Sequence, residues 1–234
     1  MKHAADYIME RDLDMGYKTQ KRILVFGDSN TFGWRPESGS EIIGGRWDDD
    51  ERFTGIMQKE LGSGYLVITE GLGGRTTVWD DPIEEYRCGK DQIIPCMDSS
   101  GPLDLVIIFL GTNDLKARYT VTARDIANSA GLLADKALHN VFAFRDMNPR
   151  VLLICPPPLG PIEQGPFRYE FQGGRERSLG LSDQFRIIAR QHQVPCFNAG
   201  DYIHASEADG VHLELDQHEI LGRKLAEIVR TMLS

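Results

Sequence analysis

Four short blocks of the sequence carry residue types that together could cleave an ester bond. They are "GDSN" (27–30), "EGLGGRTT" (70–77), "GTND" (111–114) and "ADGVH" (208–212). Acyl transfer to water needs a nucleophile, a base that accepts its proton, a group that orients the base, and donors for the oxyanion. The blocks offer a serine, a glycine-rich run, an asparagine and an aspartate–histidine pair, which is one group for each task.

Each block taken alone also fits an ordinary turn or helix cap, because Gly, Asp, Ser and Asn are the residues that turns and caps prefer. A non-enzymatic, flavodoxin-like binding domain is therefore one alternative, although it leaves the shared position of the four blocks unexplained. The blocks contain neither the G-x-S-x-G elbow of the usual α/β-hydrolases nor the lysine of a phosphate-binding loop.

A metal-dependent phosphoesterase is a second alternative, and the histidines outside the fourth block bear on it. They show no ligand spacing such as H-E-x-x-H, so we predict no metal site and no cofactor. We expect the two nearest to the fourth block, His204 and His218, to lie on the surface.

The elements that must position the blocks are short apolar runs alternating with segments of helical period. Five runs rich in Val and Ile, each closed by Gly or Pro, are typical of buried strands: 22–27, 65–69, 103–111, 150–157 and 194–200. Their nearly continuous apolar character favours a parallel sheet covered on both faces. Ligands of such sheets bind at the carboxyl ends of the strands, where the blocks lie.

Four segments between or after these runs have the apolar spacing of helices. Three are expected near 51–61, 121–145 and 175–192, and the last begins near Asp216, where Asp216 and Glu219 suggest a capping box. The alternation predicts an α/β fold: a three-layer α/β/α sandwich around a five-stranded, mainly parallel, flavodoxin-like sheet.

Composition narrows the class of protein further. The chain has 234 residues and a net charge of −9, which argues against binding to nucleic acid or to an anionic membrane. No stretch reaches the length of a membrane span, and the four widely spaced cysteines predict free thiols in a reducing cytoplasm. We expect one domain over residues 21–234 and an N-terminal extension over 1–20, either a tail or an arm that contacts a partner subunit.

The four blocks, in this order, resemble those of the SGNH hydrolases, the GDSL-type esterases. "FGDSNTFGW", "EGLGGRTTVWDDP", "LDLVIIFLGTNDLKARY", "PPPL" and "DGVH" are similar to the arylesterase/acyltransferase branch, whose members also show perhydrolase activity and assemble as octamers. The resemblance implies that Ser29 is the nucleophile, His212 the general base and Asp209 its orienting carboxylate. It also implies an oxyanion hole made by the backbone N–H of Ser29, a glycine N–H and the side-chain amide of Asn113.

Within the glycine-rich block, Gly74 is the better candidate for the glycine N–H and Gly73 the next, because a residue without a Cβ lets its N–H approach a substrate closely. We expect Asp28 to brace the nucleophile loop through hydrogen bonds, and Thr112 to support the site. Asn30 stands where the family motif has leucine.

The function implied is a serine esterase that hydrolyses small acyl or aryl esters through an acyl-enzyme, with acyl transfer as a further activity. Within the same family, a carbohydrate O-acetyl esterase and a lysophospholipase or thioesterase stay open. Two long segments, 77–102 and 156–176, carry apolar residues, and either pack against neighbouring subunits of a homo-oligomer, an octamer by resemblance, or cover their own domain.

Overall fold

A five-stranded parallel sheet forms the centre of the protein. The computed structural model describes residues 20–36, 45–163 and 165–234, so most of the expected extension over 1–20 lies outside the described residues. The strand order is β2-β1-β3-β4-β5, and every neighbouring pair is parallel. The strands are β1 (Lys21–Gly27), β2 (Tyr65–Gly71), β3 (Leu105–Phe109), β4 (Val151–Cys155) and β5 (Cys196–Asn198). All five predicted strands and the parallel sheet are confirmed.

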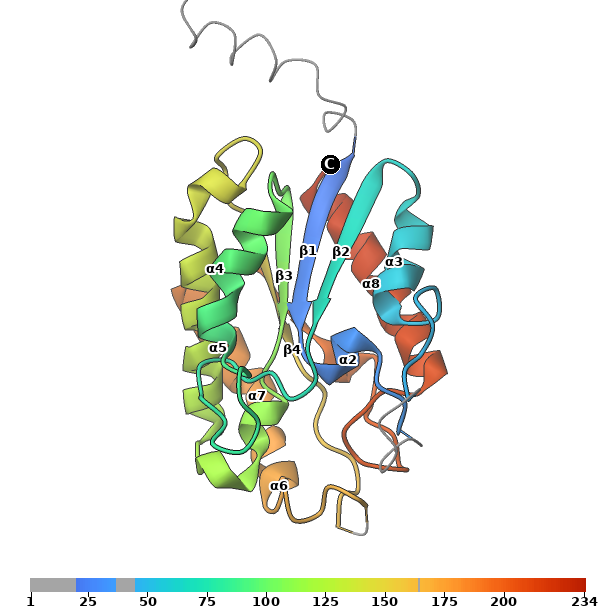
Figure 1. The fold of residues 1–234 in the computed structure, drawn as a ribbon, viewed down its shortest axis with the longest axis vertical. Coiled ribbons are helices and arrows are strands. Elements are labelled where there is room, and N and C mark those ends of the chain that lie inside the picture. The colour runs from blue at the N-terminus through green and yellow to red at the C-terminus, as the bar shows by residue number, and fades with distance from the viewer. Residues whose placement is uncertain (1–19, 37–44, 164) are drawn as a thin grey trace, which may run out of the picture.

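Helices cover both faces of this sheet and complete the predicted three layers (Figure 1). On one face lie α4 (Gly89–Ser100), α5 (Ala123–His139) and α7 (Leu181–Gln191). On the other lie α3 (Phe53–Leu61) and α8 (Leu215–Met232), which pack against each other. Among the described residues, no helix combines the length and apolar character that crossing a bilayer requires.

The two hydrophobic cores follow from the alternation of side chains along the strands. In β1, Ile23 and Val25 belong to the core beneath α3 and α8, whereas Leu24 and Phe26 belong to the core beneath α4, α5 and α7. Successive side chains of a strand point to opposite faces, so a continuous apolar run serves both cores at once.

Two helix predictions are wrong in their details. The segment 175–192 is divided into α6 (Gly174–Ser178) and α7, with Leu179 and Gly180 between them. The capping box at Asp216 and Glu219 is absent, since α8 begins one residue earlier and its N-cap, Glu214, makes no side-chain capping bond.

The helix predicted over 121–145 ends at His139 as α5, and it carries a capping box that the sequence analysis missed. The Thr122 side chain accepts from the N–H of Asp125, and the Asp125 carboxylate accepts from the N–H of Thr122. This reciprocal pair satisfies two N–H groups at the start of the helix.

Helix α4 was not predicted, because its sequence "GKDQIIPCMDSS" begins with glycine and contains Pro95. The long segment 77–102 is therefore only partly a loop. Its Ile93 is fully buried, and Phe171 of the segment 156–176 is buried in the same core, whereas Ile83 and Tyr86 are 74% and 83% exposed. Part of each long segment thus covers its own domain and part faces outward.

Candidate active site

The first block forms a tight turn between β1 and the short helix α2 (Ser29–Phe32). Asp28 is the N-cap, and its carboxylate accepts a hydrogen bond of 3.0 Å from the N–H of Asn30. Gly27 has no room for a Cβ, which would collide with the side chain of Thr31. Ser29 is therefore the first residue of a helix at the carboxyl end of a central strand, and the predicted bracing role of Asp28 matches this geometry.

The fourth block brings an imidazole to Ser29. His212 Nε2 lies 3.0 Å from Ser29 Oγ, and His212 Nδ1 lies 2.6 Å from Asp209 Oδ2. The other carboxylate oxygen of Asp209 accepts from the N–H groups of Val211, at 2.8 Å, and His212, at 2.9 Å. The loop thus fixes the carboxylate, which fixes the imidazole, and the neutral ring has its Nε2 free to accept the serine proton.

Asn30, the residue that departs from the family motif, ties the serine turn to the histidine loop. Its side chain donates to the carbonyl of Val211 at 3.3 Å and accepts from the N–H of Leu213 at 3.1 Å. These two bonds flank His212 in the chain, so Asn30 holds the imidazole loop at a fixed distance from Ser29. Leucine could make neither bond.

Two aromatic rings enclose the imidazole. Trp34 stacks on His212 with ring centroids 5.9 Å apart, and Phe167 meets it edge to face at 5.6 Å. Phe167 comes from the segment 156–176, far from the other site residues in sequence. Neither ring was predicted as a site residue, because an aromatic residue has no sequence signal that separates a pocket wall from a core position.

The second and third blocks meet on the other side of Ser29. Gly73 and Gly74 line the pocket, and Gly74 has a φ of +77°, a conformation that favours glycine. The Asn113 side chain donates to the carbonyl of Arg75 at 3.1 Å. An asparagine amide has two N–H groups, so this bond orients the amide and leaves the second N–H for a substrate oxygen.

Buried polar side chains join these two blocks to the serine turn. The carboxylate of Asp114 accepts from the N–H and the hydroxyl of Thr77, and the guanidinium of Arg75 donates to the carbonyl of Gly27 at 2.7 Å. Thr112 is buried, and its carbonyl accepts from the N–H of Leu115. The groups around Ser29 are therefore held by a connected set of hydrogen bonds.

A pocket of about 300 Å³ opens over these groups. Its apolar lining comes from Trp34, Val211 and two phenylalanines, and its charged lining comes from residues that the sequence analysis did not identify. The lining residues are Ser29, Trp34, Gly73, Gly74, Glu84, Arg87, Asn113, Lys116, Phe167, Glu170, Phe171, Val211 and His212. Each of the four sequence blocks thus contributes at least one residue to the lining of one cavity, whereas the expected site residues Asp28, Thr112 and Asp209 do not line it.

Asp28 gives a prediction about stability. Burial raises the pKa of this carboxyl from 3.8 to about 6, against the lowering effects of the Asn30 N–H and of His212 and Arg75. The pKa of Asp28 is therefore higher in the folded state than in the unfolded state. Protonation of Asp28 stabilises the folded state fully at pH values below the unfolded pKa, and this stabilisation is lost as pH rises through about 6. Asp28→Asn should therefore raise the free energy of unfolding near pH 8, by up to about 3 kcal/mol.

Urea unfolding of both proteins near pH 8 and near pH 4 measures this effect. The difference should shrink at the lower pH, where the carboxyl of the wild-type protein is protonated in the folded state and about half protonated in the unfolded state. A difference that is the same at both pH values would contradict the account of Asp28.

Of the two histidines expected on the surface, His204 is exposed, but the prediction for His218 is wrong. His218 is fully buried, stacks on Phe53 and accepts from the Phe53 N–H at 3.2 Å, at the start of α3. Burial, together with the charge of His212, lowers the pKa of His218 to about 3. His218 is thus a neutral helix cap, and the contact between α8 and α3 that buries it is not visible in the local sequence.

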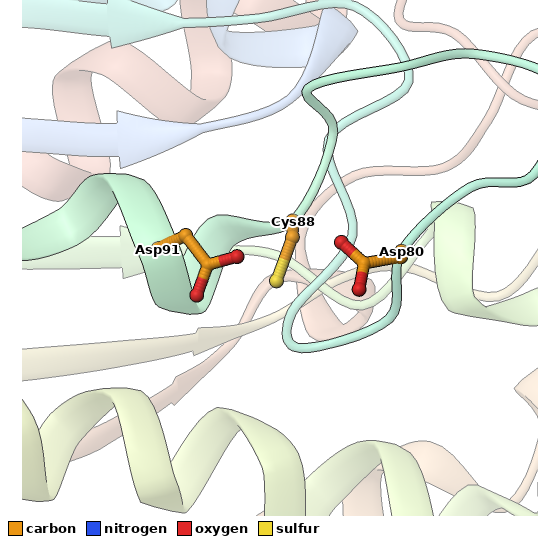
Figure 2. A group of neighbouring side chains, drawn as sticks. All are labelled: Asp80, Cys88 and Asp91. Carbon is orange, nitrogen blue, oxygen red and sulfur yellow. The ribbon is translucent and has the colours of Figure 1, made fainter.

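Asp80, Cys88 and Asp91 form the one group of three potential metal-ligating side chains in the part of the chain that the structure describes (Figure 2). Their ligand atoms lie within 4.8 Å of one another, at the start of α4. The Cys88 thiol donates to the carbonyl of Val78 at 3.3 Å, and burial raises the pKa of the thiol. None of the three lines the pocket over Ser29, so the group offers no ligands to that site.

Comparisons with known proteins agree with this geometry. Residues 25–220 match the model of the GDSL-like lipase/acylhydrolase family. An aryl esterase from M. smegmatis is 39% identical, with a TM-score of 0.86, and the alignment covers 91% of this chain and 100% of that one. Est24, a carbohydrate acetylesterase from Sinorhizobium meliloti, is 38% identical with the same coverage and TM-score.

A second solved structure from Sinorhizobium meliloti, a carbohydrate acetylesterase family member, is 31% identical and has a TM-score of 0.81, covering 92% of this chain and 99% of that one. No curated protein matches the chain. The family match spans most of the chain, and the relatives share its whole fold. The chain therefore belongs to the GDSL-like lipase/acylhydrolase family, the SGNH hydrolases, and is a carboxylic ester hydrolase.

Proposed function

We propose that Ser29, His212 and Asp209 are the catalytic triad of a serine esterase that acts on small carboxylic esters. The observation that supports this most strongly is the chain of hydrogen bonds from Asp209 through His212 to Ser29, at 2.6 and 3.0 Å, beside a pocket that also contains Gly74 and Asn113. No single block could supply this arrangement.

In the proposed reaction, Ser29 Oγ attacks the ester carbonyl carbon while His212 Nε2 accepts the hydroxyl proton. The carbonyl oxygen becomes an oxyanion, which the N–H groups of Ser29 and Gly74 and the side-chain amide of Asn113 stabilise. The oxyanion then collapses, the bond to the alcohol oxygen breaks, and His212 returns the proton to that oxygen. Water attacks the acyl-enzyme by the same steps and releases the acid.

The acyl group transferred is, in our proposal, a short one. A pocket of about 300 Å³ with charged side chains on one wall holds an acetyl group easily, whereas a long alkyl chain would displace water from the charges of Glu84 and Arg87. The acetylesterase among the relatives is consistent with this size. We also propose acyl transfer to an alcohol or to peroxide, because Trp34 and Phe167 enclose the His212 ring with apolar surface where water would otherwise approach the acyl-enzyme.

Hydrolysis of p-nitrophenyl esters from acetyl to palmitoyl tests the proposed function, with acetylated sugars assayed beside them. We expect kcat/KM to be highest for the acetyl ester and to fall steadily with chain length. Faster release of acetate from sugars would identify the carbohydrate O-acetyl esterase alternative. Preference for the palmitoyl ester would contradict the short-acyl proposal and favour a lysophospholipase or thioesterase.

We also propose that the protein assembles as a homo-oligomer, an octamer by resemblance to its branch. Supporting this, Ile83, Tyr86 and Tyr169 are exposed on the two long segments whose other residues line the pocket, with exposed fractions of 74%, 83% and 74%. Large apolar side chains gathered near one site are typical of an interface. Neighbouring subunits would then narrow the mouth of each pocket.

Light scattering at micromolar concentration measures the assembly. Tyr86→Glu should reduce the mass of the particle, because a charge would be buried in the interface. Phe142→Glu is the matched control, since Phe142 is 86% exposed but precedes β4, at the opposite edge of the sheet from the pocket. A wild-type monomer would contradict the proposed assembly.

Two further parts of the proposal concern organisation and compartment. Residues 21–234 would act as one catalytic domain with residues 1–20 as an extension, which the single sheet and its covering helices support. A cytoplasmic location is supported by the four cysteines, all free: Cys88, Cys96, Cys155 and Cys196.

A further inference from the structure

The wall of the pocket beyond the catalytic groups is built around a buried lysine. The Lys116 side chain is 3% exposed, and its Nζ lies 2.9 Å from Glu170, 3.1 Å from Glu84 and 3.6 Å from Asp81. The ammonium group thus lies among three carboxylates and donates a hydrogen bond to Glu84. Lys116 therefore joins the two long segments to each other, and its charge is balanced within the wall.

Asp81, behind Lys116, has both of its carboxylate oxygens occupied by hydrogen bonds within the protein. Burial alone would raise its pKa, but the N–H groups of Ile83 and Glu84 and the side chains of Tyr119 and Arg118 outweigh this and hold the pKa below its usual range. Both carboxylate oxygens of this ionised group are already bound within the protein, so Asp81 supports the wall and does not face a ligand.

Glu84 and Arg87, in front of Lys116, each keep hydrogen-bonding atoms that no hydrogen bond within the described residues uses. Arg87 Nε is buried and makes no hydrogen bond with any described residue, and it lies 3.6 Å from Glu84 Oε2. Both side chains lie over Gly74, where a Cβ would come 2.6 Å from Glu84 Oε2 and 3.2 Å from Arg87 Nε. A donor and an acceptor thus stand together beside one of the proposed oxyanion donors.

The proposed chemistry decides which part of the ester meets this pair. His212 must protonate the departing alcohol oxygen, so the alcohol lies on the His212 side of the pocket, between Trp34 and Phe167. The oxyanion takes the N–H groups of Ser29 and Gly74 and the amide of Asn113, which leaves the acyl group to be placed. The acyl group therefore extends past Gly74 into the rest of the pocket, which Glu84 and Arg87 line.

We propose that Glu84 and Arg87 form an acyl subsite that selects short acyl groups carrying a hydroxyl group. A hydroxyl can donate to the Glu84 carboxylate and accept from the Arg87 guanidinium at the same time, whereas a methyl group can do neither. The cluster around the subsite has three carboxylates and three cations, so it has no net charge that would attract an ionised acyl group: Asp81, Glu84 and Glu170 against Arg87, Lys116 and Arg118. This inference rests on the proposed esterase function and names its substrate class.

The test compares two p-nitrophenyl esters of the same size, hydroxyacetyl and propanoyl, in the full-length protein. The measured quantity is the ratio of their kcat/KM values, because any difference in intrinsic reactivity is the same for every variant and cancels. We expect Glu84→Met and Arg87→Met each to lower this ratio about tenfold, the effect of one charged hydrogen bond. Either variant alone is sufficient if the other fails to fold.

Glu85→Met is the matched control. Glu85 is exposed, lies on the same segment and does not line the pocket, so its replacement should leave the ratio unchanged. A ratio in both Glu84→Met and Arg87→Met equal to that of the wild type would overturn the subsite. So would a preference of the wild type for a succinyl ester over the hydroxyacetyl ester, since Arg87 would then bind a carboxylate.

The acetyl ester separates the two levels of the proposal, because it carries no hydroxyl group. Failure of the wild-type protein to hydrolyse p-nitrophenyl acetate would contradict the esterase function itself. Hydrolysis of the acetyl ester, together with an unchanged selectivity ratio in the variants, would contradict the proposed subsite but not the proposed triad.

Discussion

The Ser29→Ala variant is expected to lose about 10⁶-fold in kcat on p-nitrophenyl acetate, the loss typical of a triad without its nucleophile. The reason is that His212 would then have no hydroxyl to deprotonate, and only the oxyanion donors would act on the ester. Within the described residues, Ser29 Oγ makes one side-chain hydrogen bond, to His212, so the change removes the reaction without removing any other hydrogen bond of this side chain. Steady-state kinetics, with thermal unfolding to verify the fold, measures both effects.

Ser99→Ala is the control for this prediction. Ser99 is exposed, its hydroxyl donates to the carbonyl of Cys96 on the same helix, and it does not line the pocket. This variant should keep the wild-type rate. Substantial hydrolysis by Ser29→Ala with its fold intact would mean that another group is the nucleophile.

The second large effect is expected for Asn113→Ala. Removing one oxyanion donor lowers kcat by about 10²–10³, or about 3–4 kcal/mol, because the donor binds a charge that exists only in the transition state. KM should change little, since the uncharged carbonyl gains less from the amide. Initial rates over a range of p-nitrophenyl acetate concentrations separate the two constants.

Asn148→Ala is a suitable comparison for this variant, because Asn148 is an exposed asparagine outside the pocket. It should leave both constants unchanged. An Asn113→Ala variant with an unaltered kcat and a raised KM would make Asn113 a residue that positions the substrate and not an oxyanion donor.

The sheet and the position of the site could be predicted because their signals are local. The consecutive apolar residues of a run such as "RILVFG" indicate a buried strand without any information from distant segments. The block that follows each strand must then lie at the carboxyl edge of the sheet. The proposed roles of Ser29, Asp209 and His212 came from the family motif, and the structure brings these three side chains into one hydrogen-bonded chain.

The rest could not be predicted because it depends on contacts between distant segments. Lys116 is buried only because Glu84 and Glu170 reach it from segments 32 and 54 positions away, and a lysine in isolation is typical of a surface. His218 is buried by α3, and α4 forms despite Pro95 because Ile93 packs under the sheet. In each case tertiary packing overrides the local preference.

Labelling with a fluorophosphonate, followed by mass spectrometry of the intact protein and of its peptides, tests the central claim most directly. A serine reacts with this reagent when a neighbouring base activates its hydroxyl, and only Ser29 has such a base in our account. We predict one adduct per chain, on the peptide that contains Ser29, and no adduct in His212→Ala. An adduct on a different serine, or none on an enzyme that hydrolyses p-nitrophenyl acetate, would contradict the account.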